Sequence, residues 1–122
     1  MASLELTAEN FNTTIDNNPF VIVDFWAEWC GPCKAFAPTF EAVSDKHPDI
    51  VFGKVDTEAQ QDLAGSFAIR SIPTLMAIRD GVILFQQAGA LPASALESLI
   101  EQLRAVNMDD VRAEIAKQDN QS

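Results

Sequence analysis

The chain contains two cysteines, Cys30 and Cys33, in the segment Cys30-Gly31-Pro32-Cys33. Pro32 has the fixed φ angle of a first helical turn and lacks the N–H that such a turn can spare, so we expect a helix to begin here. The free N–H groups and the dipole of a helix N-terminus favour an anion, and therefore favour the thiolate of Cys30. Cys33 lies one turn deeper, within reach of a disulfide with Cys30. The spacing predicts a nucleophilic thiol, Cys30, and a resolving thiol, Cys33.

The plainer interpretations of this pair are a zinc half-site, a structural disulfide and two inert thiols. A closed zinc site needs four ligands, and beyond the pair the chain offers no cysteine and one histidine, His47, which we expect to be a solvated residue at a helix end. A purely structural disulfide would stabilise little, because closing so short a loop removes little entropy from the unfolded chain. We therefore expect no metal and no cofactor, and a redox-active pair.

The segment before the cysteines, residues 21 to 26, has the pattern of a buried strand. Its residues are apolar at both alternating sets of positions except for one carboxylate, Asp24, which is typical of a strand covered on both faces. Residues 50 to 56 form a second such segment, which carries Lys54. The first strand therefore leads directly into the reactive pair, and it carries a carboxylate that we expect to be buried.

Hydrophobic spacing and turn residues predict the remaining elements. These are a short strand at residues 3 to 6, a helix capped by Thr7, a helix from about Pro32 to Lys46 kinked at Pro38, a helix near residues 57 to 64, strands at 74 to 79 and 82 to 87 joined by Asp80-Gly81, and an amphipathic helix over residues 91 to 106. Helices that alternate with the first strands indicate parallel pairing, whereas the two-residue turn indicates an antiparallel hairpin. The sequence therefore predicts an α/β fold with a mixed sheet.

Length and composition limit the classes of function. A chain of 122 residues, of which 48% are hydrophobic, is long enough for one domain with a core and too short for two. Its apolar runs are too short to span a membrane, and its first five residues lack the basic start and apolar centre of a signal peptide. A formal net charge of −10 repels nucleic-acid phosphates and anionic lipids. We therefore expect a cytoplasmic protein in a reducing compartment, without nucleic-acid or membrane partners.

Three segments resemble the thioredoxin family. They are residues 23 to 34 (VDFWAEWCGPCK), Ile72-Pro73-Thr74 and Gly89-Ala90, and the similarity extends over about residues 3 to 106. The resemblance implies the thioredoxin fold, a central mixed five-stranded sheet flanked by helices. It also implies a general protein-disulfide reductase of bacterial type, which acts on disulfide-containing proteins through its cysteine pair and is recycled by a thioredoxin reductase.

The same resemblance implies roles for particular residues. Asp24 matches the buried carboxylate of the family and Lys54 its lysine neighbour, so both are expected to be catalytic, with Asp24 as the proton acceptor behind Cys33. The Ile72-Pro73 bond is expected to be cis, with the preceding residue offering backbone hydrogen bonds to a substrate chain. The surface expected to bind substrate around Cys30 comprises Trp29, Gly31, Pro32, Ile72, Pro73, Ala88, Gly89 and Ala90.

Residues 108 to 122 extend beyond the minimal pattern of the family. Met108, Val111 and Ile115 recur at helical spacing, and two aspartates follow Met108 where a first helical turn favours negative charge. We expect a short added helix followed by a disordered tail. The chain then divides into a thioredoxin domain at residues 1 to 107 and an extension at residues 108 to 122, in a protein expected to be a monomer.

Two other functions remain open from the sequence. An oxidase or isomerase of the same fold would use the same cysteines in an oxidising compartment, and a non-enzymatic subunit would use the fold only as an interaction surface. The Gly31-Pro32 dipeptide and the lack of a signal-peptide pattern favour the reductase.

Overall fold

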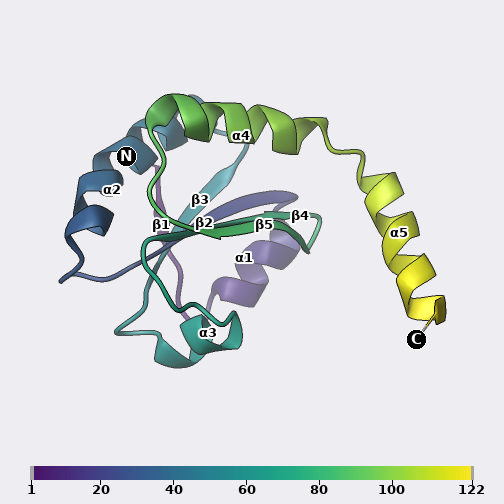
Figure 1. Cartoon of the computed structure of the whole chain (residues 1–122), viewed down its shortest axis with the longest axis horizontal. Helices are drawn as coiled ribbons and strands as arrows, with labels where there is room; N and C mark the ends of the chain where they lie inside the picture. Colours follow the sequence, from purple (N-terminus) through teal and green to yellow (C-terminus); the bar gives the residue numbers. More distant parts are fainter. Residues whose placement is uncertain (1, 122) are drawn as a thin grey trace.

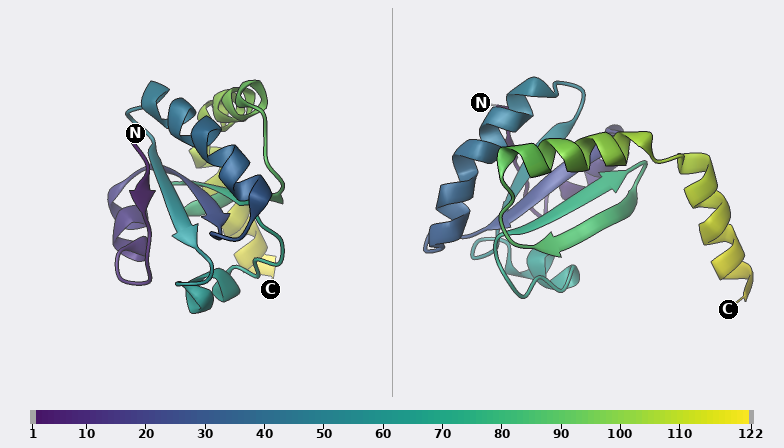
Figure 2. Two further views of the ribbon diagram at one scale, coloured as in Figure 1. Left: turned by 90° about the vertical axis from the view of Figure 1, so that its left-hand side faces the viewer. Right: turned by 45° about the horizontal axis from the view of Figure 1, so that its top comes forward.

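The computed structural model describes residues 2–121, which form one sheet with helices on both faces (Figures 1 and 2). The strands are β1 (Leu4–Glu5), β2 (Phe20–Trp26), β3 (Val51–Asp56), β4 (Thr74–Arg79) and β5 (Val82–Ala88), in the spatial order β1-β3-β2-β4-β5. The helices are α1 (Phe11–Asn17), α2 (Gly31–Lys46), α3 (Gln61–Ser66), α4 (Ala93–Ala105) and α5 (Met108–Gln121). β3 pairs in parallel with β1 and β2, whereas β4 pairs antiparallel with β2 and β5, so the prediction of a mixed five-stranded sheet is confirmed.

The central strand β2 is buried on both faces, as its sequence predicts. Phe20 and Ile22 belong to a core cluster that includes residues of α2 and α4. Val21, Val23 and Phe25 point to the other face and belong to a cluster that includes residues of α1 and α3. The two pairs of helices therefore cover opposite faces of the sheet, with α2 and α4 together on one side (Figure 1).

The pairing of β1 with β3 requires a close approach of side chain and backbone. Gly53 on β3 is buried, and a Cβ atom at this position would overlap the Leu6 side chain. The backbone N–H of Leu6 donates to the Lys54 carbonyl oxygen over 2.8 Å. A glycine at position 53 therefore lets the N-terminal segment pack tightly against β3.

Two helices begin later than the sequence predicts. Thr7 does not cap α1: its backbone N–H donates to the Asn10 Oδ1 atom over 2.7 Å, in a turn that precedes the helix, and α1 starts at Phe11. The helix expected near residues 57 to 64 is α3, which starts at Gln61 because Asp56 Oδ1 accepts from the N–H groups of the two residues that follow Thr57 and so stabilises a turn there. Hydrogen bonds from side chains to nearby backbone groups compete with helix formation at both places.

Other predicted features are present. The turn between β4 and β5 is Asp80-Gly81, and both residues have positive φ angles, of 52° and 78°. This conformation is typical of a two-residue hairpin and favours glycine at the second position. The helix α2 runs through Pro38 without interruption, and the kink expected there stays a prediction. The helix α4 buries one face, through Leu96, Ile100 and Leu103.

The C-terminal helix α5 extends away from the sheet (Figures 1 and 2). The expectation of a short helix followed by disorder is wrong in its extent, because α5 continues to Gln121, through residues that mostly have good helix propensity. Met108 is buried at its start, and Arg112 forms an ion pair with Asp80 at 3.1 Å. Arg79, beside Asp80, donates to carbonyl oxygens at the end of α4. The hairpin turn therefore holds the junction of α4 and α5, while the division of the chain at residue 107 stays a prediction.

Candidate redox site

Cys30 and Cys33 are joined by a disulfide at the N-terminus of α2, with their Cα atoms 5.3 Å apart. Cys30 is the N-cap residue, and the backbone N–H of Cys33 lies 3.2 Å from its Sγ atom and donates to it. In the dithiol form, this N–H and the helix dipole would stabilise a negative charge on Cys30. In the disulfide form both side chains are buried, with 4% of Cys30 and 2% of Cys33 exposed. The helix start, rather than exposure, therefore distinguishes the two sulfur atoms.

Asp24 lies within β2 and is fully buried, and neither of its carboxylate oxygens has a hydrogen-bond partner among the described residues. Burial disfavours the charged carboxylate and raises the pKa of Asp24 to about 7, while the positive charge of Lys54 opposes this rise. Side chains alternate across a strand, so Asp24 shares the face on which Phe20 and Ile22 pack in the cluster with α2. The carboxylate therefore lies on the side of the sheet covered by α2, the helix that carries Cys33.

Lys54 lies beside Asp24, in register with it across the parallel pair of β2 and β3. The Nζ atom of Lys54 is 4.7 Å from the centroid of the Trp26 ring, which is the geometry of a cation–π contact. The structure thus places the lysine next to the carboxylate, as predicted. Its ammonium group, however, rests on an aromatic face.

Trp29, next to Cys30, has 70% of its surface exposed. Its indole N–H donates to the Glu58 Oε1 atom over 2.6 Å. Glu58 lies in the loop after β3, where Asp56 Oδ1 accepts from its backbone N–H over 2.9 Å. The sequence analysis did not identify Glu58, because no local pattern links two residues that are 29 positions apart. This contact fixes the orientation of a large apolar ring at the edge of the disulfide.

Two loops meet the start of α2 at the disulfide. The Ile72-Pro73 peptide bond is cis, as expected from the resemblance. The carbonyl oxygen of Ile72 is 3.8 Å from Cys30 Sγ, and the N–H of Gly89 donates to the Pro73 carbonyl oxygen over 2.8 Å. Four other residues predicted to bind substrate are exposed. Gly31 and Pro32 lie at the start of α2, and Ala88 and Ala90 lie at the end of β5 and just after it. The structure therefore brings together the predicted segments, while the binding role of each residue stays a prediction.

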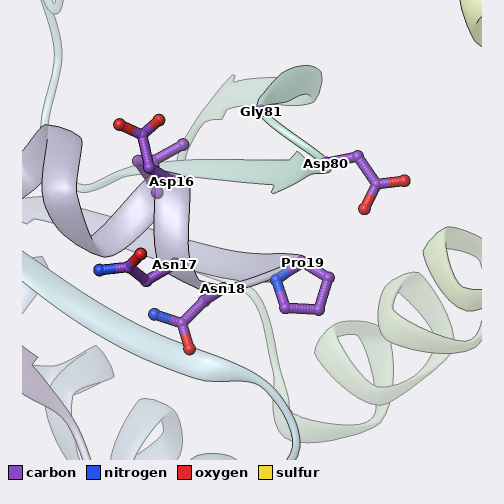
Figure 3. A pocket seen from close by; sticks show the side chains of 7 residues that line it. Asp16, Asn17, Asn18, Pro19, Asp80 and Gly81 are labelled. Carbon is purple, nitrogen blue, oxygen red and sulfur yellow. The ribbon is translucent and has the colours of Figure 1, made fainter.

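The cavity of about 350 Å³ shown in Figure 3 lies elsewhere, at the end of β2 opposite the cysteines. Its lining comprises Ile15, Asp16, Asn17, Asn18, Pro19, Asp80 and Gly81. The carboxylates of Asp16 and Asp80 point away from each other, so they do not form a common site (Figure 3). Residues 2–121 contain no group of three or more His, Cys, Asp or Glu side chains placed to hold a metal ion. Nor is any helix among them long and apolar enough to cross a bilayer.

The sequence model of the family described as Thioredoxin matches residues 2–102. This chain belongs to the thioredoxin family. As a thioredoxin it is an oxidoreductase, and the disulfide-bonded pair Cys30 and Cys33 is the redox-active centre for thiol–disulfide exchange. The fold predicted from the sequence is thereby confirmed as the thioredoxin fold.

Individual thioredoxins are similar over most of the chain. A putative thioredoxin 2 from Streptomyces coelicolor is 54% identical over 121 residues, which cover 99% of this chain and 90% of that protein. The thioredoxin of Bacillus subtilis is 36% identical over 101 residues, which cover 82% of this chain and 96% of that protein. A solved structure of Plasmodium falciparum thioredoxin matches with a TM-score of 0.75 and 39% identity, over 80% of this chain and 96% of that one. The predicted resemblance to bacterial thioredoxins is therefore confirmed.

Proposed function

We propose that this thioredoxin is a general protein-disulfide reductase whose dithiol is restored by a thioredoxin reductase. The observation that carries the proposal is the place of Cys30 at the N-cap of α2, where the backbone N–H of Cys33 donates to its sulfur. This arrangement stabilises the thiolate, which is the nucleophilic form of cysteine. Cys30 is therefore the thiol that attacks the substrate.

The reaction consists of two exchange steps. The Cys30 thiolate attacks one sulfur of the substrate disulfide, a mixed disulfide forms, and the other substrate sulfur leaves as a thiolate. Cys33 then gives up its proton and attacks the Cys30 sulfur, which releases the second substrate sulfur. The substrate has gained two electrons as a dithiol, and the protein has lost them in forming its own disulfide. A reductase must then supply two electrons to restore the dithiol.

Asp24 is the proton acceptor for Cys33 in the second step. A pKa of about 7, raised by burial, leaves part of the carboxyl ionised at neutral pH and makes that ionised form a stronger base than an exposed aspartate. Lys54 supports the ionised form through its positive charge. Asp24 has to be partly ionised and also a sufficiently strong base, because it must accept a proton in one half of the cycle and return it in the other.

The substrate chain lies along the exposed surface beside the disulfide. The carbonyl oxygen of Ile72, 3.8 Å from Cys30 Sγ, is placed to accept a hydrogen bond from an extended backbone. Small and apolar residues around it leave room for segments of many sequences, which fits a general reductase. Of the residues proposed to form this surface, six are exposed: Trp29, Gly31, Pro32, Ala88, Gly89 and Ala90. Ile72 is half-buried and Pro73 is buried, so these two would contribute mainly through their backbone.

Trapping experiments test the roles of the two cysteines. The Cys33→Ser variant should accumulate a stable mixed disulfide between Cys30 and a protein substrate, because the second step is blocked. The Cys30→Ser variant is the matched control, since it also retains a single thiol, and it should react more slowly. Trapping at the same speed in both variants would contradict the assignment.

The redox potential tests the direction of the reaction. We propose that the protein works as a reductant in the cytoplasm, where disulfide-containing proteins are its substrates. Equilibration of the purified protein with a series of glutathione ratios measures its potential. A value below that of the cytoplasmic glutathione couple supports a reductase, whereas a much higher value would indicate an oxidase or isomerase.

We further propose that residues 1 to 107 form the catalytic domain and that residues 108 to 122 are an extension outside the redox chemistry. The family match ends at residue 102, and α5 begins at Met108. The match to the Streptomyces coelicolor protein, in contrast, covers 99% of the chain. The extension therefore lies within the match to that protein, outside the part of the chain that the family model covers.

A further inference from the structure

The ammonium group of Lys54, whose charge acts on Asp24, lies against the ring of a third residue, Trp26. The Lys54 Nζ atom lies 4.7 Å from the centroid of the Trp26 ring. Neither oxygen of Asp24, the residue in register with Lys54, has a hydrogen-bond partner among the described residues. The ammonium group therefore rests on the ring and not on the carboxylate.

Trp26 is held in place by the backbone around it. It is the last residue of β2, and its carbonyl oxygen accepts from the N–H of Thr57 over 2.8 Å and from the Thr57 hydroxyl over 3.0 Å. Lys54 is half-buried on a flexible side chain, and its ammonium group is strongly hydrated wherever water reaches it. Without the aromatic face, the ammonium would move toward water and away from the fully buried Asp24.

The groups that face Asp24 from neighbouring elements include one positive charge. On β3 the neighbour is Lys54, and on β4 the residue in register is the uncharged Leu75. The helix α2 covers this face of the sheet with Cys33 and Phe36, both buried and neither a permanent charge. Among these neighbours, Lys54 is therefore the one whose position most affects how readily the Asp24 carboxyl ionises.

We propose that Trp26 is a positioning residue for the proton transfer from Cys33 to Asp24, because its indole face holds the Lys54 ammonium beside the buried carboxylate. The inference rests on the proposed role of Asp24 as the proton acceptor. A positive charge kept close to a carboxylate favours its ionised form. The effect of the ring on the Asp24 proton cannot exceed the strength of the cation–π contact, so loss of a contact that is partly open to water raises the pKa of Asp24 by less than about one unit.

The test removes the electron density of the ring while keeping its shape. A tetrafluorinated tryptophan is incorporated in the Trp29→Phe variant, so that Trp26 alone carries the fluorine atoms, and the same variant with ordinary tryptophan is the matched control. The carboxyl carbon resonance of Asp24 in the oxidised protein then reports its pKa directly. Because a fluorinated face no longer attracts a cation, we expect the pKa of Asp24 to rise by about half a unit.

Comparing fluorinated and ordinary tryptophan again in a Lys54→Met background tests whether Trp26 affects Asp24 through Lys54. Methionine keeps the length of the side chain without its charge, so Lys54→Met should raise the pKa of Asp24 by itself. If Trp26 acts through Lys54, fluorination should then change nothing further. An equal shift in both backgrounds would mean that the ring acts on Asp24 directly and not through Lys54, and would overturn the proposal, as would no shift where Lys54 is present.

Release of a mixed disulfide separates this inference from the proposed function. The pH profile of release should move to higher pH with fluorination, which slows release about threefold on its acidic side for half a pKa unit. A shift of the Asp24 resonance with unchanged release would refute Asp24 as the proton acceptor, and with it the kinetic role of Trp26. An unshifted resonance would refute the positioning role of Trp26 and leave the role of Asp24 intact.

Discussion

The buried carboxylate of Asp24 makes stability depend on pH in a direction that can be measured. Burial raises its pKa from the ordinary value of 3.8 to about 7, with Lys54 opposing the rise. In the unfolded chain the carboxyl ionises near its ordinary value, so between about pH 4 and about pH 7 the folded state holds a proton that the unfolded state has lost. The free energy of unfolding should therefore fall as pH rises through this window.

The size of the fall follows from the shift. Roughly three pKa units correspond to about 4 kcal/mol of stability, lost by the time the pH has passed the folded-state pKa. Asp24→Asn cannot ionise and should lack this decline. A buried, unpaired amide carries its own cost, about 1–3 kcal/mol, but that cost does not change with pH. Between about pH 4 and about pH 8, the difference in stability should therefore move by about 4 kcal/mol in favour of the variant.

Urea unfolding of the oxidised proteins across this pH range measures the difference. Asp62→Asn is the matched control, because Asp62 is exposed on α3 and the same substitution there should leave the pH slope of the wild type. Release of a mixed disulfide at neutral pH should meanwhile slow in Asp24→Asn, since Cys33 loses its proton acceptor. Parallel stability curves for wild type and Asp24→Asn, with unchanged release, would show that Asp24 is neither a strained buried acid nor the base.

Three further predictions concern regions away from the disulfide. Deleting residues 108–122 should leave turnover with a small protein disulfide nearly intact and lower stability modestly, because Met108 is the one buried side chain among residues 108–120; a large loss of turnover in a folded protein would give the extension a functional role. Gly53→Ala should lower the free energy of unfolding by about 1–3 kcal/mol, since the new Cβ overlaps Leu6, and unchanged urea unfolding would contradict that packing. The hydrogen bond from Arg104 lowers the pKa of Asp49 from 3.8 to about 2. The ionised Asp49 should therefore stabilise the folded state above about pH 3.8, and this stabilisation should be lost as the pH falls through about 2. Asp49→Asn should flatten this acid limb of the stability curve, weakly and less at high salt because both side chains are exposed, and an unaltered limb would count against the pair.

The features that the sequence predicts well depend on local pattern. A strand that is apolar on both faces has to be covered on both faces, and residues 21 to 26 lie in such a strand, β2. The Asp80-Gly81 turn predicted the antiparallel hairpin in the same way, because few residues tolerate its backbone conformation. Pro32 likewise predicted that a helix begins at the cysteine pair, and the spacing of Cys30 and Cys33 predicted that they can form a disulfide.

The features that the sequence misses depend on contacts between distant residues. His47, expected to be solvated, has 18% of its side chain exposed and contacts Glu97 and Arg104 on α4. The hydrogen bond between Trp29 and Glu58 joins the redox site to the loop after β3. Neither contact leaves a periodic signal, because each pairs single side chains from different elements. Such pairs become visible only when the fold fixes which elements are neighbours.

Folding alone does not explain Asp24, whereas its proposed role as a proton acceptor does. Every neighbouring position in β2 from Phe20 to Phe25 is buried, so an apolar side chain at position 24 would avoid the cost of about 4 kcal/mol at pH values above the folded-state pKa. A direct ion pair with Lys54 would remove that cost, but it would hold the carboxylate ionised and make it a weak base. If Asp24 had no positive charge near it, burial alone would instead keep the carboxyl protonated at neutral pH. The observed arrangement lies between these limits, because Lys54 rests on Trp26 and acts on Asp24 without bonding to it. A carboxyl that titrates near neutral pH can both accept and return a proton, as the proposed role of Asp24 as the proton acceptor for Cys33 requires.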